Sequence, residues 1–356
     1  MQVKLTDIIN IYNNLTKTVK NKNKLYNFEK NKMQNISIIY DKLTNGYDGG
    51  NYNIFLIKDP KKRIVMSQNI IDKTINHYVN NYILVPKLTK YLLNTNVATR
   101  KNMGTSKANY LLNKYIEKHK KNNKFYILKM DIEKYFYNID HIVLINLLNN
   151  ILIKDELNLV IPIIKSTNKN YINNKIKKLN IDINYKQNKG LPLGTLTSQT
   201  LAIFYLSEID KILQNKYKVN FIHFMDDYII LNKSKLHLQN ILKEIKKILN
   251  NKYKLNLNKK TLLINSNETF EFIGKTYKIK NKKTIKKIKN KTIYRIKKNY
   301  KLKTKLYNKN KLDKNKYINM KKTYKSYNNS KINRIIKNNK KINLNNLINK
   351  INFNCE

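Results

Sequence analysis

The sequence predicts an α+β fold in which a buried antiparallel sheet carries acidic residues at one end. The first observation is the stretch 221–231, where the adjacent Asp226 and Asp227 stand between two short apolar, β-prone runs. This pattern predicts a β-hairpin with the acids at its turn. The second observation is a strand-like run at 125–130 that ends at a third acid, Asp131. Amphipathic helical segments flank both runs, so we expect sheet and helices to pack together.

A pair of adjacent acids is weak evidence by itself, because aspartate is common in ordinary surface turns. The flanking residues are too apolar for a surface hairpin, so we expect a buried sheet to present the acids. Carboxylates that converge from the ends of neighbouring strands suit Mg²⁺, which takes oxygen ligands. Two such ions about 3.5–4 Å apart clamp the attacking and leaving oxygens in phosphoryl transfer. The acids therefore predict a site for phosphoryl transfer.

Three ordered motifs make this interpretation more specific. Residues 129–136 read KMDIEKYF, residues 190–199 read GLPLGTLTSQ, and residues 224–227 read FMDD. In this order and spacing they resemble motifs A, B and C of reverse transcriptases of the bacterial retroelement kind, although most relatives have Tyr in place of Phe224. The resemblance runs from about residue 52 to about residue 277.

The resemblance implies a right-hand polymerase fold. Its expected parts are fingers at 1–130, a palm at 131–278 with a helical fingers insertion at about 142–188, and a basic helical thumb at 281–356. It also implies an enzyme, an RNA-directed DNA polymerase (a nucleotidyltransferase) that extends a primer with dNTPs on an RNA template.

The same resemblance implies a set of catalytic and metal-binding residues. Asp131, Ile132, Asp226 and Asp227 would hold two Mg²⁺ ions, or Mn²⁺. Asp131 and Asp226 would contact both ions, and Asp227 would support the site from one side. In a segment that resembles motif D, Lys260, or else Lys259, would protonate the leaving pyrophosphate as a general acid.

Two arginines are candidates for binding phosphate. Residues 52–66 predict a hairpin with a basic turn that contains Pro. Arg63 at this turn has the planar fork that suits phosphate, and Lys58 and Lys62 are weaker candidates. Arg100 lies in a segment that resembles the second fingers motif, where it either contacts phosphate or shapes the loop.

Phe136 stands five residues after Asp131, where the family has its steric gate. A bulky ring under the sugar would clash with a ribose 2′-hydroxyl, so the enzyme would select deoxynucleotides by exclusion. Core packing is the alternative role for such a ring, and we expect it of the neighbouring Tyr135. Asp140 is expected to cap the next helix.

Motif B contains both the expected features and a departure from the family. Gly194 would let the backbone approach a nucleotide closely. Many reverse transcriptases have Gln where this chain has Leu193 and Pro where it has Gln199, and the form found here is similar to that of diversity-generating retroelement enzymes. Loss of that Gln removes a polar contact near the nucleotide, so base selection is expected to be looser.

The remaining segments are predicted from hydrophobic periodicity and cap residues. The sequence predicts one or two short helices in 1–50, a helix at 68–93, a helix at 108–121, helices and then a loop in 151–188, a helix capped by Thr197 or Ser198, a helix capped by Ser234, a strand pair at 270–277 and helices beyond 280, including positions 332–348.

The net charge of +51 suits a polyanionic partner. A codon bias toward Lys, Asn, Ile and Tyr would raise the charge without any selection for binding, so the motifs have to carry the function. The expected partners are the template RNA, an RNA/DNA primer duplex and dNTPs, with an accessory protein or a dedicated non-coding RNA as a further possibility.

The only cysteine, Cys355, excludes a disulfide within one chain and fits a reducing cytosol. The N-terminus has no apolar core of a signal peptide, and no apolar run is long enough for a membrane span. We therefore expect a cytoplasmic protein with no membrane partner.

Several functions compete with this interpretation. An RNA-dependent RNA polymerase shares the chemistry of the palm, but Phe136 argues against it. A non-catalytic RNA-binding protein on a polymerase scaffold is a second competitor, against which the three intact acids argue. For the biological setting, the form of motif B favours a diversity-generating retroelement, with an antiphage-defence reverse transcriptase as the alternative and an intron maturase as less favoured.

Overall fold

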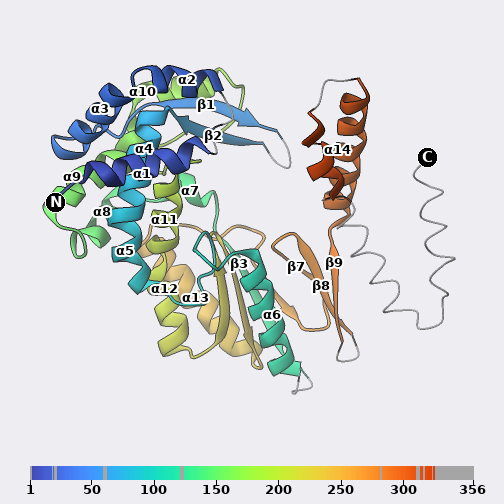
Figure 1. The fold of residues 1–356 in the computed structure, drawn as a ribbon. Helices are drawn as coiled ribbons and strands as arrows, with labels where there is room; N and C mark the ends of the chain where they lie inside the picture. The colour runs from blue at the N-terminus through green and yellow to red at the C-terminus, as the bar shows by residue number, and fades with distance from the viewer. Residues whose placement is uncertain are drawn as a thin grey trace. The chain divides into compact units, whose positions relative to one another are not determined.

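Figure 1 shows the computed structural model of the chain, which describes residues 2–17, 19, 22–58, 62–120, 124–280, 283–309, 313–315, 317–322 and 324. The chain divides into two compact units, Met1–Ser266 and Asn267–Glu356. Helices are mixed with antiparallel sheets, so the predicted α+β class is confirmed. No helix among the described residues is long and apolar enough to cross a membrane.

The first unit begins with three helices, where the sequence predicted one or two: α1 (Leu5–Thr16), α2 (Lys22–Lys30) and α3 (Lys32–Thr44). Helices α1 and α3 pack against α4 (Ile70–Tyr78). The buried face of α1 carries Ile8, Ile11, Tyr12 and Leu15, and the Tyr12 ring stacks on Phe28 of α2 with 4.5 Å between centroids.

The predicted basic hairpin is formed by β1 (Tyr52–Ile57) and β2 (Arg63–Gln68), which pair antiparallel. Alternate residues of the two strands are buried, as expected when one face of a hairpin is covered. The buried face contributes Tyr52, Ile64 and Met66 to a small core shared with α10 (Asn170–Lys177).

The predicted helix at 68–93 exists, but its geometry changes along its length. Asn69 caps α4, which continues into a π-helical segment η1 (Val79–Leu84), then α5 (Val85–Leu88) and the short 3₁₀ segment η2 (Thr89–Tyr91). Pro86 stands in the first turn of α5. Because proline has no N–H and its ring crowds the preceding turn, a regular α-helix cannot continue through this position.

The first unit contains further helices, some along its central sheet and others beside the β1–β2 hairpin (Figure 1). They are α6 (Thr105–Lys120), α7 (Tyr135–Asn138), α8 (His141–Asn149), α9 (Lys154–Lys165), the 3₁₀ segment η3 (Ser166–Asn168), α10, α11 (Leu196–Tyr205), α12 (Ser207–Lys211), the π-helical segment η4 (Ile212–Lys216) and α13 (Lys235–Asn251).

Two of the three predicted helix caps are confirmed and one is wrong. The side chain of Asp140 accepts hydrogen bonds from two amides of α8, and Ser234 accepts one from His237 in α13. Helix α11 is capped by Thr195 instead of Thr197 or Ser198, because Thr195 has the extended backbone of a cap and accepts from the Ser198 amide.

The central sheet has four antiparallel strands in the order β4-β5-β3-β6. Its strands are β3 (Tyr126–Asp131), β4 (Asn220–Phe224), β5 (Asp227–Asn232) and β6 (Leu262–Asn265). The middle residues of β4 and β5 are buried in succession, so both faces of this hairpin are covered. Helix α6 packs against β4 and β5, and α13 packs against β3 and β5.

The second unit contains a three-stranded sheet in the order β7-β8-β9, followed by a helix: β7 (Phe270–Phe272), β8 (Lys275–Lys280), β9 (Lys283–Ile288) and α14 (Asn290–Asn308). The predicted strand pair with a glycine turn is confirmed by β7 and β8. The prediction of helices directly after residue 280 is wrong for β9, whose pairing with β8 overrides its weak helical pattern. The helical positions predicted at 332–348 lie outside the described residues.

Candidate active site

The adjacent acids lie where the sequence predicted them, on the β4–β5 hairpin. Phe224 pairs with Asp227, so Met225 and Asp226 form a two-residue turn. Of these two turn residues only Met225 has a positive φ, of 60°. A positive φ at the first position of a two-residue hairpin turn is usually adopted by glycine, asparagine or aspartate. A left-handed conformation at a non-glycine residue costs roughly 1–3 kcal/mol, so the surrounding structure has to hold this turn in place.

The register of the sheet brings the third acid to the same end. Asp131, the last residue of β3, pairs directly with Asp227 of β5. Paired residues project from the same face of a sheet, so these two carboxylates share a face. The amide of Ile132 donates a 3.1 Å hydrogen bond to the carbonyl of Asp226. Backbone pairing therefore gathers all three acids at one end of the central sheet.

A lysine lies on the same face. Lys129 is two residues before Asp131, and its Nζ is 3.8 Å from Oδ1 of Asp227. This cation compensates part of the negative charge that three neighbouring carboxylates create.

The oxygen donors at this end of the sheet fit hard divalent cations. Ile132 and Leu257 form an isolated antiparallel β-bridge. Its two hydrogen bonds use the Asp131 carbonyl and the Glu133 amide, so the Ile132 carbonyl takes no part in the bridge. Within the described part of the chain, however, no three His, Cys, Asp or Glu side chains are gathered as closely as a metal cluster requires. Like charges repel in the absence of a cation, so such carboxylates are expected to converge only around one.

The turn that carries Lys259 and Lys260 is attached to Asp131. The amide of Asn258 donates to the Asp131 carbonyl at 2.7 Å, and the Asp131 amide lies 3.4 Å from Oγ1 of Thr261. Both lysines are exposed. The structure thus joins the motif D segment to the end of β3 and leaves the two cations in solvent.

The first half of the motif B loop lies on the backbone of α7. The Gly190 amide donates to Ile139 at 2.8 Å, and the Leu191 amide donates to Phe136, also at 2.8 Å. The Phe136 ring is half-buried and lies edge-on to Tyr135, with 5.9 Å between centroids. The expectation that Tyr135 packs in the core agrees with its burial, since its hydroxyl donates to Ala202 inside the unit.

A buried histidine that the sequence did not single out supports this loop from behind. Nε2 of His141 is 2.7 Å from the Gly190 carbonyl, which also accepts from Oγ1 of Thr167 at 3.0 Å. Burial lowers the pKa of His141. A neutral ring that donates from Nε2 satisfies this carbonyl inside the protein.

The second half of the motif B loop meets the basic hairpin. The amide of Met66 in β2 donates a 2.7 Å hydrogen bond to the Leu193 carbonyl. Gly194 has a φ of 116°, and a Cβ at this position would lie 3.0 Å from Val65 and 3.1 Å from the Met66 carbonyl oxygen. The backbone at Gly194 thus lies close to β2. Gln199 is half-buried in α11.

A pocket of about 150 Å³ opens beside this contact. Its walls come from β2, α4 and the start of α11, and they include Gln68, Lys73, Asn76, His77 and Gly194. Among the described residues, Nε2 of Gln68 and Nδ2 of Asn76 have no hydrogen-bond partner. Burial and Lys73 lower the pKa of His77 to about 4, so its ring is neutral at physiological pH. Unused donors beside a cation suit a ligand rich in acceptors.

The two candidate arginines lie in different environments. Arg63 is exposed at the start of β2, with Lys58 and Lys62 exposed on the same connection, and residues 59–61 at its tip lie outside the described residues. Arg100 is half-buried, and its Nη1 donates to the carbonyls of Leu93 and Asn96 at 2.7 and 2.8 Å. Burial lowers its pKa. Arg100 thus closes its own loop, which was one of the two roles predicted for it.

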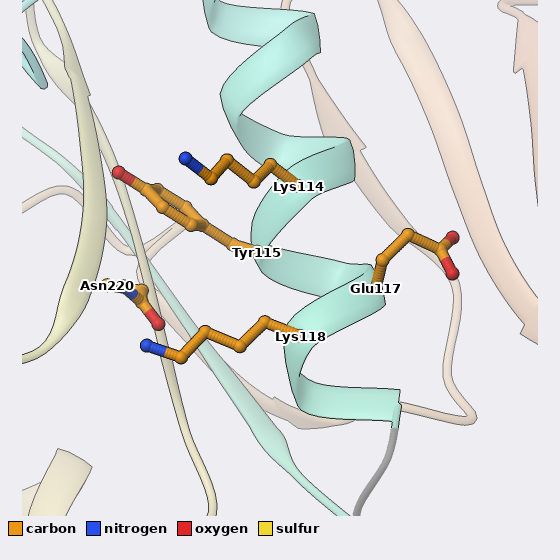
Figure 2. A pocket seen from close by; sticks show the side chains of 5 residues that line it. All are labelled: Lys114, Tyr115, Glu117, Lys118 and Asn220. Carbon is orange, nitrogen blue, oxygen red and sulfur yellow. The ribbon is translucent and has the colours of Figure 1, made fainter.

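A larger pocket of about 480 Å³ lies at the opposite end of β4 from the acidic turn. Lys114, Tyr115 and Lys118 extend from α6 on the side of Asn220, whereas Glu117 points away (Figure 2). Because Asn220 begins β4 and Asp226 follows its end, this pocket is separate from the acidic site.

The family comparison agrees with this arrangement. A profile of the family "Reverse transcriptase (RNA-dependent DNA polymerase)" matches residues 57–277, a range that contains the acids, the motif B loop and Lys260. The chain therefore belongs to the reverse transcriptase family, and its α+β fold is the polymerase fold of that family. A search of curated protein sequences found no match.

Solved structures similar to the chain include telomerases. A Candida tropicalis telomerase without its C-terminal domain has 16% sequence identity and a TM-score of 0.49, and the match covers 71% of this chain and 60% of that one. A Candida albicans telomerase in complex with a fragment of telomeric RNA has 14% identity and a TM-score of 0.43, with 67% and 45% covered. The chain thus spans less than two thirds of the length of these proteins.

Proposed function

We propose that this protein is an RNA-directed DNA polymerase that extends a primer with dNTPs on an RNA template. The observation that carries the proposal is the pairing of Asp131 with Asp227, next to the turn that contains Asp226. Membership of the reverse transcriptase family supports the same activity. Phosphoryl transfer depends mainly on positioning and charge neutralisation, which an end of a sheet with three acids can provide through bound cations.

The proposed metal ligands are the carboxylates of Asp131, Asp226 and Asp227 and the carbonyl of Ile132. Two Mg²⁺ ions, or Mn²⁺, would supply activation of the primer hydroxyl and stabilisation of the leaving pyrophosphate. Lys129 would hold Asp227 to one side, which supports the proposal that Asp227 has the auxiliary role. Lys260 would donate a proton to the pyrophosphate, supported by the attachment of its turn to Asp131.

The proposed nucleotide and template site lies along the motif B loop. Phe136 would contact the sugar, while Leu193, Gly194 and Gln199 would line the path of the base and template. Arg63 would bind the triphosphate, and Arg100 would act on phosphate only if it released Leu93 and Asn96. The unused donors of Gln68 and Asn76 support binding of a base edge or phosphate in the adjoining pocket.

We further propose the setting of a diversity-generating retroelement, with antiphage defence as the alternative. Leu193 and the motif B form around it support the first setting. A template repeat and a variable repeat near the gene would favour diversification. The proposed partners are a template RNA and a primer duplex, together with an accessory protein or a dedicated non-coding RNA.

Primer extension tests the activity directly. Wild-type protein is expected to extend oligo(dT) on poly(rA) with dTTP and Mg²⁺, and Asp226→Asn is expected to be inactive. Glu133→Gln is the matched control, because Glu133 is an exposed acid close to Asp131. If wild type and Asp226→Asn are equally inactive with an accessory protein and a dedicated RNA supplied, the chain is an RNA-binding scaffold instead. Incorporation of UTP in place of dTTP would identify an RNA polymerase.

A further inference from the structure

A buried polar cluster lies directly behind the acidic turn. His223 of β4, Asp210 of α12 and Asn96 are each fully buried. Nδ1 of His223 is 3.0 Å from Oδ2 of Asp210, and Nδ2 of Asn96 donates to the same carboxylate oxygen at 3.1 Å. On the other side of the ring, Nε2 of His223 is 2.7 Å from the carbonyl oxygen of Met225. His223 therefore connects α12 to the turn that contains Asp226.

The hydrogen-bond partners define what the ring has to do. A carbonyl oxygen accepts only, so Nε2 of His223 has to carry the hydrogen in its contact with Met225. Its Nδ1 lies 3.0 Å from the Asp210 carboxylate oxygen and 3.0 Å from Nδ2 of Asn96, so polar partners hold the ring on both sides.

The Tyr228 ring and a backbone bridge fix the orientation of His223. Its ring stacks on Tyr228, its partner across the hairpin, with 4.0 Å between centroids and 15° between planes. Burial and Asp210 raise the pKa of Tyr228, as expected for a phenol next to a buried carboxylate. The His223 backbone also makes a parallel bridge with Asn96, in the loop that Arg100 closes.

The hydrogen bond from His223 is made to the turn residue that has the strained backbone. Met225 has a positive φ, and its carbonyl is the acceptor of the His223 hydrogen bond. The next residue is Asp226, whose own carbonyl accepts from Ile132. The turn is therefore tied on one side to α12 through His223 and on the other side to the end of β3.

We propose that His223, held by Asp210 and bonded to the Met225 carbonyl, is a positioning residue that keeps the strained turn in the conformation in which Asp226 can reach a metal shared with Asp131. This inference rests on the proposed polymerase function. His223 would not contact substrate or metal, and would act through the turn alone.

The test compares two buried histidines. In His223→Gln the side chain has a single nitrogen, so it cannot make the contacts to both Asp210 and Met225 that the two ring nitrogens of histidine make. His119→Gln is the matched control, since His119 is also buried and contacts Asn220 at the far end of β4. For His223→Gln we expect kcat to fall about 10–100-fold and half-saturating Mg²⁺ to rise, with little change in the KM for dNTP.

A second readout is independent of activity. In metal-free protein, amide hydrogen exchange at residues 224–228 is expected to be about tenfold faster in His223→Gln than in wild type or His119→Gln, the scale of one lost hydrogen bond. Asp210→Asn should produce the same pattern more weakly. In the double variant the two effects should not multiply, because both act on one connection.

The outcomes separate this inference from the proposed function. If wild type extends primers and His223→Gln matches His119→Gln in Mg²⁺ dependence and exchange, the positioning role is wrong. If wild type extends no primer, the polymerase proposal fails, while the exchange rates still report whether His223 holds the turn. If His223→Gln does not fold, Asp210→Asn takes its place in both measurements, and normal exchange at 224–228 in that variant would overturn the inference.

Discussion

The first unit contains two β-hairpins that carry opposite charges and are built differently. In the β4–β5 hairpin, which carries Asp226 and Asp227, the middle residues of both strands are buried and the turn has two residues. In the β1–β2 hairpin, which carries Lys58, Lys62 and Arg63, burial alternates along the strands and the connection between Ile57 and Arg63 is longer. The acids are thus half-buried at the end of a covered hairpin, whereas the cations are exposed.

The difference matches what each charged hairpin is proposed to bind. Metal ions shared by several carboxylates require ligand oxygens at fixed positions, so a buried hairpin supported by His223 suits the acids. A triphosphate is flexible and hydrated, and exposed cations on a short hairpin can adjust to its conformation. The basic hairpin contacts the motif B loop directly, because the Met66 amide donates a hydrogen bond to the Leu193 carbonyl.

Substitution of Asp227 is expected to have the largest of the following effects, and it tests whether Asp227 and Asp226 have different roles. Asp227→Asn keeps the size of the side chain but removes the charge that faces Lys129. We expect primer extension to fall by about 10²-fold, less than for Asp226→Asn, because an auxiliary ligand is lost while the shared ligands remain. Asp140→Asn is the control, since an asparagine can still cap α8 and activity should be unchanged. Equal loss in Asp226→Asn and Asp227→Asn would refute the auxiliary role.

Much of this acidic site could be predicted from sequence because its signals are local. An apolar run that ends in Asp131 and an apolar hairpin with acids at its turn are patterns of neighbouring residues. The caps Asp140 and Ser234 are local as well, and both are confirmed. Thr195 was missed as a cap because Thr197 and Ser198 offer the same hydroxyl chemistry two and three residues later.

The remaining features depend on contacts that no local pattern encodes. His223 and Asp210 are brought together by the packing of β4 against α12, and in the sequence His223 is only one polar residue within an apolar strand. The donors of Gln68 and Asn76 line one pocket only because β2 and α4 pack side by side. Strand β9 forms because β8 offers it an edge, not because its own residues favour a strand.

A smaller effect is expected at the basic hairpin. Arg63→Ala removes an exposed cation and should raise the KM for dNTP about tenfold with little change in kcat, the scale of one charged hydrogen bond to phosphate. Steady-state kinetics with dTTP measure both constants. Lys114→Ala in the separate pocket on α6 is the control and should leave both unchanged. A fall in kcat alone for Arg63→Ala would contradict binding of the triphosphate in the ground state.

The contact between motif B and the basic hairpin can be disturbed through Gly194. A Cβ added there meets Val65 and the Met66 carbonyl oxygen, and a φ of 116° is strained for any other residue. Gly194→Ala should therefore lower kcat/KM by severalfold to about tenfold, because overpacking by a single methyl group is expected at the lower end of the usual range, about 1 kcal/mol.

Gly46→Ala is the matched control for this variant. Gly46 also has a positive φ, of 137°, but no atom lies within 4 Å of an added Cβ. Its effect should be limited to a small fall in the unfolding temperature. Similar kinetics for Gly194→Ala and Gly46→Ala would show that the motif B loop does not depend on its contact with β2.

The smallest expected effect concerns the accuracy of copying. Leu193 bonds to β2 only through its backbone carbonyl, so Leu193→Gln changes the side chain without removing that hydrogen bond. A glutamine amide beside the nucleotide would add a polar contact that a correctly paired base can use, and one neutral hydrogen bond is worth about 1 kcal/mol. We therefore expect misincorporation on a defined RNA template to fall about fivefold, while Leu236→Gln, an exposed change on α13, leaves it unaltered. An unchanged error rate in Leu193→Gln would mean that base selection is set elsewhere, and the support that Leu193 gives to a diversity-generating role would be lost.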